Sequence, residues 1–443
     1  MPERQTNWGM LLTVSGPGAE HLARALRAAI RDGVVPPGAA LPPSRRLADD
    51  LSCSRWVVTQ AYAQLIAEGY LVGRTGSATR VSETGPSDTA RPPAPEPIPP
   101  RYDLAPGVPD LRAFPRQRWI DAARQVLSTM PHTDLGVPPV GGHPRLRAVL
   151  AEYLRRVRGA VTEDVLICSG VTDGVHRIAR ALKGAVAVED PGWPRLWRAA
   201  SSAGVRTVPV PVDEDGLRVD LIPSGVKAVV VTPAHHFPTG VVLSPARRAS
   251  LLAWADANDG LILEDDYDAE FRYDRRPVGT MQGLAPRRVV LLGSVSKTLS
   301  PALGIGWCVI PPQWTQEVAS ANPTASAPPV LDQLTLAEFI TTGAYDRHLR
   351  TARLTYRARR DALLTALPDA HISGAAAGLH LLLHLNQPAT ALVQKAATHN
   401  LKVRNLDDYR TTPGPPALVL GYGNLADNAI TDAVAALRAA GYR

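Results

Sequence analysis

The residues best suited to covalent chemistry lie in the stretch 293–307, GSVSKTLSPALGIGW, which presents Ser294, Ser296 and Lys297 after an apolar run. The chain holds five lysines against 43 arginines, so a lysine here is not a routine basic residue. A lysine amine can form a Schiff base with an aldehyde, and neighbouring hydroxyls can bind a phosphate. We therefore predict that Lys297 forms an imine, although the motif alone also fits an exposed surface lysine.

Two further apolar runs end in residues that can bind the same small molecule. VLIC precedes SGVTDGV, in which Val171 and Thr172 open a helix whose free amides and dipole can hold a phosphate; an ordinary capped helix is the alternative. AVAVED precedes PGWPR, in which Trp193 can lie against an aromatic ring or belong to the core. Arg195 can bind the carboxylate of an effector or form a surface ion pair.

A third run, LILE, precedes DDYDAE. An aspartate at a buried strand end can pair with a pyridinium nitrogen, and a nearby tyrosine can bond the phenolate oxygen of that ring. We choose Asp265 and Tyr267 for these roles, with a solvated acidic loop or a weak cation-binding turn as alternatives. His235 and His236 are adjacent rather than one helical turn apart, and the three cysteines are widely spaced, so we predict no metal site.

The elements that must position these side chains are short apolar strands alternating with helical stretches. VLIC, AVAVED, AVVVTP, LILEDD and VVLLGS have the composition of buried parallel strands. In a doubly wound sheet the ligand lies outside the carboxyl ends of such strands, where all four groups of candidate residues follow. We therefore predict an α/β domain with a mostly parallel sheet and a small C-terminal α+β subdomain.

The front of the chain is a different, smaller domain. Apolar residues at helical spacing predict a first helix near residue 22. Ser44 is placed to cap a second helix and Ser54 to cap a third. The inner face of the third helix is predicted to be Val57, Ala61, Tyr62 and Leu65. Two β-prone runs around a Gly-rich turn follow, as in a winged helix-turn-helix. Residues 82–101 contain seven prolines and predict a linker, so the domains are 1–81 and 102–443.

The third helix of this front domain has a composition suited to double-stranded DNA. Ser54 and Arg55 stand at its amino end, where phosphates and base edges lie close, and Thr59 is one turn further on. Arg45 at the start of the second helix can reach a phosphate or a guanine edge. Trp56 can either pack or touch sugar and thymine methyl groups. A trihelical domain without a ligand is the alternative.

The stretch PPGAALPPSRRLADDLSCSRWVVTQAYAQLIAEGYLVGRTGSATRV resembles the DNA-binding domain of the GntR superfamily, which implies further DNA contacts at Thr75 and Gly76 of the wing. Residues 102–443, with EDDYDAEF and SVSKTLSPALGIGW, resemble fold-type I aminotransferases, and the combination resembles the MocR-type regulators. The resemblance implies pyridoxal 5′-phosphate bound to Lys297 as an internal aldimine, to Asp265 and Tyr267, with Trp193 stacked on its ring. It also implies a domain-swapped head-to-tail homodimer that senses a small-molecule effector.

This sequence departs from the family pattern at three positions. Gly304 replaces the usual arginine that clamps the cofactor phosphate, and Val137 replaces a tyrosine that reaches the phosphate of the neighbouring subunit. Both changes predict a weakened phosphate clamp. Asn424 stands where relatives that bind amino acids often have a carboxylate-binding arginine.

No run of 18 apolar residues and no signal-peptide pattern occurs, which predicts a cytoplasmic protein without a membrane partner. The leading interpretation is a DNA-binding transcriptional regulator whose rear domain binds pyridoxal phosphate, a small effector or both. An active aminotransferase with an appended DNA-binding domain, and a regulator that has lost the cofactor, are the alternatives. We predict that the protein is not an enzyme and that at most it performs a partial transamination.

Overall fold

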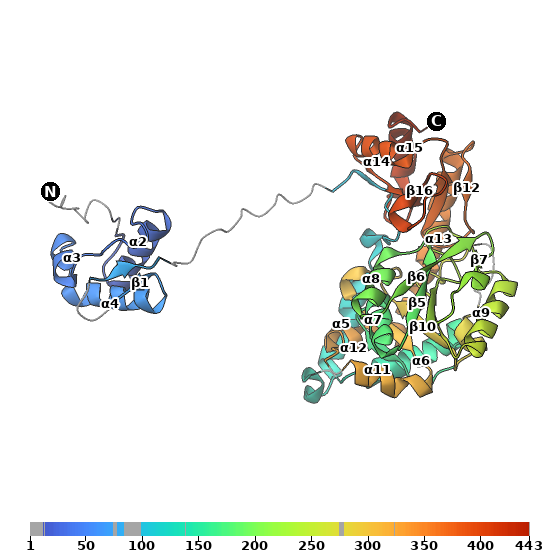
Figure 1. Cartoon of the computed structure of the whole chain (residues 1–443), viewed down its shortest axis with the longest axis horizontal. Helices are drawn as coiled ribbons and strands as arrows, with labels where there is room; N and C mark the ends of the chain where they lie inside the picture. Colours follow the sequence, from blue (N-terminus) through green and yellow to red (C-terminus); the bar gives the residue numbers. More distant parts are fainter. Residues whose placement is uncertain are drawn as a thin grey trace. The chain divides into compact units, whose positions relative to one another are not determined.

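The computed structural model describes residues 12, 14–73, 78–83, 99–137, 139–273, 279–322 and 324–442. The chain divides into two compact units, residues 1–98 and 99–443, drawn at the blue end and in the cyan-to-red part of Figure 1. No helix in the described ranges is long and apolar enough to cross a membrane.

The first unit is a winged helix-turn-helix. Its elements are α2 (Ala19–Arg31), α3 (Ser44–Asp50), α4 (Arg55–Ala67), β1 (Leu71–Val72) and β2 (Arg80–Val81). The two strands are antiparallel, with Leu71 opposite Val81. Side chains from all three helices and both strands form one core, in which Leu26, Leu47 and Leu65 are fully buried.

Two details of this unit differ from the sequence prediction. Pro43, not Ser44, is the N-cap of α3, because Ser44 is already the first helical residue and its hydroxyl accepts a hydrogen bond from Arg55 across the turn. Val58 lies on the fully buried face of α4 with Ala61, Tyr62 and Leu65, at the i, i+3, i+4, i+7 spacing of one helix face, whereas the predicted Val57 is only partly buried against the same core. Ser54 caps α4 as predicted, since its hydroxyl accepts a hydrogen bond from the Val57 amide.

The second unit is built on an eight-stranded sheet in the order β4-β11-β10-β9-β8-β5-β6-β7. The central strands β10, β9, β8, β5 and β6 are mutually parallel, and the three other strands are joined by antiparallel pairings. The predicted apolar runs are β4 (Leu166–Cys168), β5 (Ala185–Asp190), β8 (Val226–Val231), β9 (Leu261–Asp265) and β10 (Val289–Ser294). The remaining strands are β6 (Thr207–Asp213), β7 (Gly216–Leu217) and β11 (Gly306–Val309).

Helices cover both faces of this sheet, as Figure 1 shows. Successive residues of β5 point to opposite faces: Val186 and Val188 pack with α7 (Val171–Ala181) and α8 (Pro194–Ser202), while Ala187 packs with α9 (Pro245–Ala257) and α10 (Met281–Leu284). A strand that is buried on both faces needs apolar residues throughout, which is why these runs are continuous rather than alternating. A third core joins the β4–β11 edge to α5 (Arg116–Thr129), α6 (Pro144–Arg158) and α12 (Val330–Thr341).

The C-terminal part forms the smaller α+β subdomain. An antiparallel sheet in the order β12-β13-β16-β15 packs with α14 (Ala389–Thr398) and α15 (Ile430–Ala439). Its strands are β12 (Ile372–Ser373), β13 (His380–His384), β15 (Arg404–Asn405) and β16 (Ala417–Gly421). The strand β3 (Tyr102–Asp103) joins this part by parallel pairing with β14 (Leu401–Lys402), and α13 (Ala344–Ala366) contributes to the same core. Residues 102–110 therefore belong to the subdomain farthest from them in sequence.

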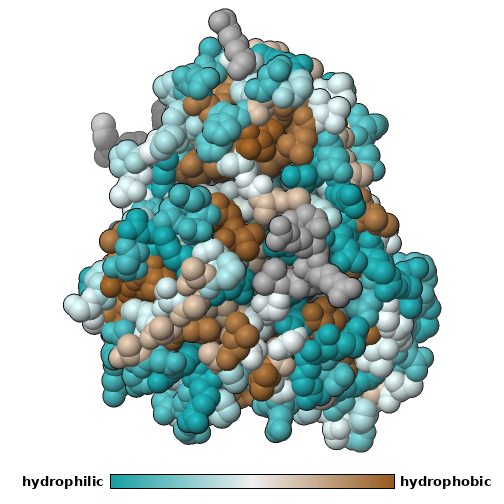
Figure 2. Space-filling view, turned by 90° about the vertical axis from the view of Figure 1, so that its right-hand side faces the viewer, coloured by the Kyte–Doolittle hydropathy of each residue, from teal (hydrophilic) through white to brown (hydrophobic). Residues whose placement is uncertain are grey.

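On the side of the molecule shown in Figure 2, hydrophobic side chains gather in several separate patches between hydrophilic ones.

The remaining described elements are short: α11 (Thr315–Ala321) and the 3-10 helices η1 to η7. The η segments span Leu111–Ala113, His132–Leu135, Val219–Leu221, Pro301–Leu303, Pro312–Trp314, Leu406–Tyr409 and Asp427–Ala429.

Candidate functional site

A pocket of about 440 Å³ lies at the carboxyl ends of the parallel strands. This volume is within the usual range for a small-molecule or cofactor site. All eight predicted cofactor residues and the predicted effector residue line it, together with eight residues that were not predicted. The lining residues are Pro106, Gly107, Ser169, Gly170, Val171, Thr172, Trp193, Arg195, Thr232, Phe237, Asp265, Tyr267, Ser294, Ser296, Lys297, Pro301 and Tyr409.

Lys297 points its amine into this pocket from the turn after β10. Its Nζ donates a hydrogen bond to the Gly107 carbonyl and lies 5.8 Å from the centre of the Trp193 ring. Burial lowers the pKa of Lys297, and Arg195 lowers it further, while the charges of Asp265 and Asp268 act in the opposite direction. A lower pKa increases the fraction of neutral amine, which is the form that attacks an aldehyde.

Asp265 ends β9 and is almost fully buried beside the pocket. Its Oδ1 has no hydrogen-bond partner among the described residues. Burial, reinforced by Asp266 and Asp268, raises the pKa of Asp265 to about 8. A buried carboxylate oxygen without a partner is costly unless a ligand supplies a donor. A pyridinium N–H would supply one, so this residue fits pyridoxal phosphate.

The phosphate end of the candidate site is a corner between the first turn of α7 and the turn after β10. Gly170 is the N-cap of α7, and Val171 and Thr172 present backbone amides there. Gly306 lies so close that a Cβ on it would be 2.5 Å from the Gly170 Cα. Ser294 and Ser296 form the opposite side, and both line the pocket. A helix amino end with two hydroxyls has the chemistry of a phosphate site.

Aromatic and cationic side chains form the rim of the pocket. Trp193 is half-buried at the amino end of α8, and the exposed Arg195 places its guanidinium carbon 5.8 Å from the Trp193 ring centre. Tyr409 comes from the C-terminal subdomain, and its backbone carbonyl accepts a hydrogen bond from Gly192. The pocket thus has an exposed cation among the residues that line it.

The three positions that the sequence predicts to depart from the family pattern, Gly304, Val137 and Asn424, lie outside the pocket lining. Gly304 has φ +57° and no atom within 4 Å of a Cβ built on it. Val137 is 93% exposed. Asn424 donates to Asp103, and its backbone carbonyl accepts a hydrogen bond from Arg112, so Asn424 serves contacts within the C-terminal subdomain.

Sequence reasoning missed the residues that contact the reactive groups from distant segments, chiefly Gly107, Tyr409 and the pair His235 and Asp268. Gly107 is 190 residues from Lys297 in sequence. His235 lies in the loop after β8, and its Nδ1 is 2.8 Å from Asp268 Oδ2 and 3.1 Å from the Tyr267 hydroxyl. The adjacency of Asp268 to Tyr267 in DDYDAE was the signal available in the sequence.

In the first unit, the predicted DNA-contacting residues Arg45, Ser54, Arg55, Trp56 and Thr59 are all exposed. Arg55 donates to Ser44, so α3 and α4 present their polar ends together. Trp56 is 67% exposed in the first turn of α4, so it is not a core residue. The Thr59 hydroxyl donates to the Arg55 carbonyl. The predicted wing contacts Thr75 and Gly76 lie outside the described residues.

Comparison with known families supports this division of the chain. Residues 18–81 match the bacterial regulatory proteins of the gntR family, and residues 102–418 match the aminotransferases of class I and II. The fold of the second unit is also that of the kynurenine aminotransferase of Pyrococcus horikoshii, with a TM-score of 0.70 and 23% identity over 76% of this chain and 90% of that one.

Two regulators resemble the chain over most of its length. The pyridoxine biosynthesis transcriptional regulator PdxR of Corynebacterium glutamicum is 33% identical over 91% of both chains. The probable rhizopine catabolism regulatory protein MocR of Rhizobium meliloti is 36% identical over 81% of this chain and 78% of that protein.

A winged helix of the gntR type joined to an aminotransferase fold defines a class of DNA-binding transcriptional regulators. Within this class, the chain belongs to the MocR-, PdxR- and TauR-type helix-turn-helix regulators. Pyridoxal phosphate is the cofactor of the family from which the second unit derives.

Proposed function

We propose that this regulator binds pyridoxal 5′-phosphate at Lys297 and that occupancy of the pocket changes its affinity for DNA. The observation that carries the proposal is the meeting of three groups in one cavity: the amine of the half-buried Lys297, a buried carboxylate oxygen without a described partner, and a helix amino end near two serines. No simpler ligand uses an aldehyde-reactive amine, a pyridinium acceptor and a phosphate corner at once.

Each residue has a definable task toward this cofactor. Lys297 joins it covalently, Asp265 accepts its ring N–H, and Tyr267 donates to its phenolic oxygen. Trp193 covers the ring face, while Ser294, Ser296 and the amides of Val171 and Thr172 bind the phosphate. When bound, pyridoxal phosphate supplies an aldehyde that reacts reversibly with amines, so an amine effector can compete with Lys297 for it.

Arg195 is the proposed effector contact. It is exposed at the pocket rim, 5.8 Å from the Trp193 ring centre, and can form a bidentate pair with a carboxylate. We therefore propose an amine that also carries a carboxylate as the effector class. The name of the relative PdxR suggests pyridoxal phosphate itself as another signal that this pocket can sense.

A continuous segment connects the pocket to the linker. Residues 102–110 pair with β14, accept a hydrogen bond from Gly421 at Leu104, and end at Asp110, whose carboxylate binds Arg359. The same segment holds the Lys297 amine through the Gly107 carbonyl. A reaction that consumes this amine removes its hydrogen bond to Gly107, so we propose that residues 102–110 transmit occupancy toward the DNA-binding unit.

We also propose a head-to-tail, domain-swapped homodimer acting on DNA in the cytoplasm. Apolar side chains of α5 and η2 are widely exposed in the single chain, including Ile120, Leu127 and Leu135, and burial of such a surface favours association. The domain boundaries that we propose are 1–81, 82–101 and 102–443.

Absorption spectroscopy tests the cofactor assignment. The purified protein saturated with pyridoxal phosphate should show a visible band that the Lys297→Ala variant lacks, whereas Lys395→Ala, which alters an exposed lysine of α14, should retain it. A colourless wild-type protein would contradict the assignment. Steady-state turnover with a panel of amino donors would instead support the alternative of a working aminotransferase, while a single half-reaction would not.

A further inference from the structure

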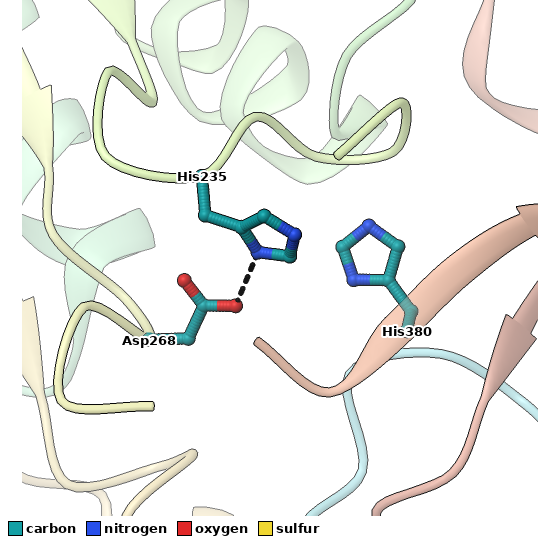
Figure 3. Close-up of side chains that lie close together, drawn as sticks. All are labelled: His235, Asp268 and His380. Atoms are coloured by element: carbon teal, nitrogen blue, oxygen red, sulfur yellow. Dashed lines mark hydrogen bonds and ion pairs between the residues drawn. The ribbon is translucent and has the colours of Figure 1, made fainter. Parts of the chain in front are cut away.

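Behind Tyr267 lies a buried cluster of His235, Asp268 and His380, which come from the loop after β8, the turn after β9 and the start of β13 (Figure 3). His235 and Asp268 each expose about 1% of their side chains. The rings of His235 and His380 are 4.8 Å apart between centroids. The roles proposed above leave this cluster unused.

The hydrogen bonds of the cluster determine where its protons lie. His235 Nδ1 is 2.8 Å from Asp268 Oδ2, and an ionised carboxylate only accepts, so Nδ1 carries the proton. His235 Nε2 has no hydrogen-bond partner among the described residues. Because His235 Nδ1 and Asp268 Oδ2 are hydrogen-bonded to each other, neither atom is free to bind a metal ion in this arrangement. The cluster is therefore better suited to directing protons.

Tyr267 adjoins this pair and has one proton to donate. Its hydroxyl is 3.1 Å from His235 Nδ1, which already carries a proton and therefore cannot accept one from Tyr267. We infer that the Tyr267 proton points to the neighbouring Asp268 carboxylate, which hydrogen-bonds with Tyr267. Burial, together with the charge of Asp268 and a hydrogen bond to it, raises the pKa of Tyr267 well above its usual value. Asp268 thus competes for the proton that Tyr267 would donate to the phenolic oxygen of a bound cofactor.

The surroundings hold this arrangement rigidly. A Cβ on Gly378 would lie 2.2 Å from His235 Nδ1 and 2.4 Å from Asp268 Oδ2, so the backbone of residue 378 closes directly over the pair. Phe237 packs edge-on against both His380 and Tyr267. The other titratable groups near the Tyr267 hydroxyl are Asp265, Tyr422 and, across the pocket, Lys297.

We propose that Asp268 and His235 are positioning residues that control how strongly Tyr267 donates its proton to the cofactor, and thereby set the protonation of the Lys297 nitrogen once it is joined to pyridoxal phosphate. This inference rests on the proposed binding of that cofactor. When the nitrogen loses its proton, the phenolate oxygen loses a neighbouring donor, so a strong Tyr267 hydrogen bond favours the deprotonated form.

The two positioning residues should have opposite effects. Asp268→Asn removes the competing acceptor and a negative charge, so the pKa of the Lys297 nitrogen should fall by about one unit, a tenfold change in its acid dissociation constant. His235→Leu leaves the Asp268 carboxylate with Tyr267 as its remaining donor in the cluster, so the same pKa should rise. His235→Asn, which restores an N–H near the position of Nδ1, should return it toward the wild-type value.

A spectrophotometric pH titration of the full-length protein loaded with pyridoxal phosphate measures this pKa. His384→Gln is the control, since His384 stacks on His371 at the other end of β13 and should leave the midpoint unchanged. In a Tyr267→Phe background the Asp268→Asn shift should shrink to less than half, because the effect acts through Tyr267.

The outcomes separate the inference from the proposed function. Absence of any visible band in the wild-type protein overturns cofactor binding and this inference with it. If the pH midpoint of the visible band is the same in Asp268→Asn as in the wild-type protein, only the inference is overturned. The same holds if Asp268→Asn shifts the midpoint by its full amount in the Tyr267→Phe background. If Asp268→Asn does not fold, the opposite behaviour of His235→Leu and His235→Asn provides the same test, and identical midpoints in those two variants would reject the positioning role.

Discussion

At the residue scale, the buried carboxyl of Asp265 combines a cost to folding with a use in binding. Its pKa in the folded protein, about 8, is above the ordinary 3.8 because burial disfavours the ionised form. The folded state therefore holds this proton more tightly than the unfolded chain, and the contribution of Asp265 to stability falls as pH rises from about 4 to about 8. A ligand donor at Oδ1 would offset that cost.

Asp265→Asn should accordingly act in two directions. It should raise the free energy of unfolding of the cofactor-free protein at pH 8 by at least about 1 kcal/mol, which a higher melting temperature would report. At pH 4.5 the gain in stability should be small. It should also weaken pyridoxal phosphate binding by roughly ten- to hundredfold, since a charge-assisted bond contributes about 1.5–3 kcal/mol. Thermal melts at the two pH values and cofactor titrations measure both. Equal stabilisation at both pH values would contradict the assigned cause.

Gly304 provides a second residue-scale prediction. Gly304→Arg should tighten pyridoxal phosphate binding about tenfold to hundredfold, because a phosphate clamp contributes about 1.5–3 kcal/mol. The left-handed backbone strain at φ +57° should lower the stability of the folded protein with and without cofactor, and so should leave the cofactor affinity unchanged. Gly304→Ala, which brings the strain without the guanidinium, is the matched control. Equal cofactor affinities in the two variants would show that the arginine does not reach the phosphate.

At the element scale, α4 carries the predicted recognition of DNA. Arg55 is exposed at its amino end and is oriented by Ser44 of α3. Ser54 caps the helix, which keeps its first amides pointing outward. An exposed Trp56 in the same turn adds an apolar surface suited to thymine methyl groups.

Arg55→Ala should weaken binding to the operator by about tenfold and reduce the salt dependence of binding by about one phosphate contact. Arg24→Ala is the control, because it removes the same charge from α2, where Arg24 pairs with Glu20 on the surface. Fluorescence anisotropy with the promoter region of the protein's own gene, at several salt concentrations, measures both quantities. Equal losses in the two variants would indicate a nonspecific charge effect.

At the scale of the whole molecule, regulation requires a coupling free energy between ligand binding in the pocket and DNA binding by the first unit. If pyridoxal phosphate changes DNA affinity by a given factor, DNA must change pyridoxal phosphate affinity by the same factor, typically about 5- to 150-fold. Cofactor titrations of the full-length protein with and without operator DNA should show this reciprocity. Identical cofactor affinities in both titrations would mean that the pocket does not control DNA binding.

Local sequence patterns were enough to predict the buried strands, the group of residues that meets at the pocket and the start of α4. Continuous apolar runs identified the five buried strands, and the parallel arrangement of their carboxyl ends was enough to predict that residues 171, 193, 265 and 297 meet. The position of Ser54 before α4 likewise identified a helix start, because a cap acts within three residues. The prediction for Ser44 was wrong by one residue, because α3 already begins at Ser44 and its N-cap, Pro43, makes no side-chain cap hydrogen bond.

Contacts between distant segments were decided only by the tertiary structure. The hydrogen bond from Lys297 to Gly107 depends on how residues 102–110 join the C-terminal subdomain, and the His235–Asp268 pair depends on two loops closing under Gly378. Sequence spacing determines which side chains a strand presents at its end. The backbone that packs against the end of the strand determines which acceptor is hydrogen-bonded by a lysine or tyrosine there. Hydrogen bonds act over about 3 Å, and no local sequence pattern encodes the position of a distant segment to that precision.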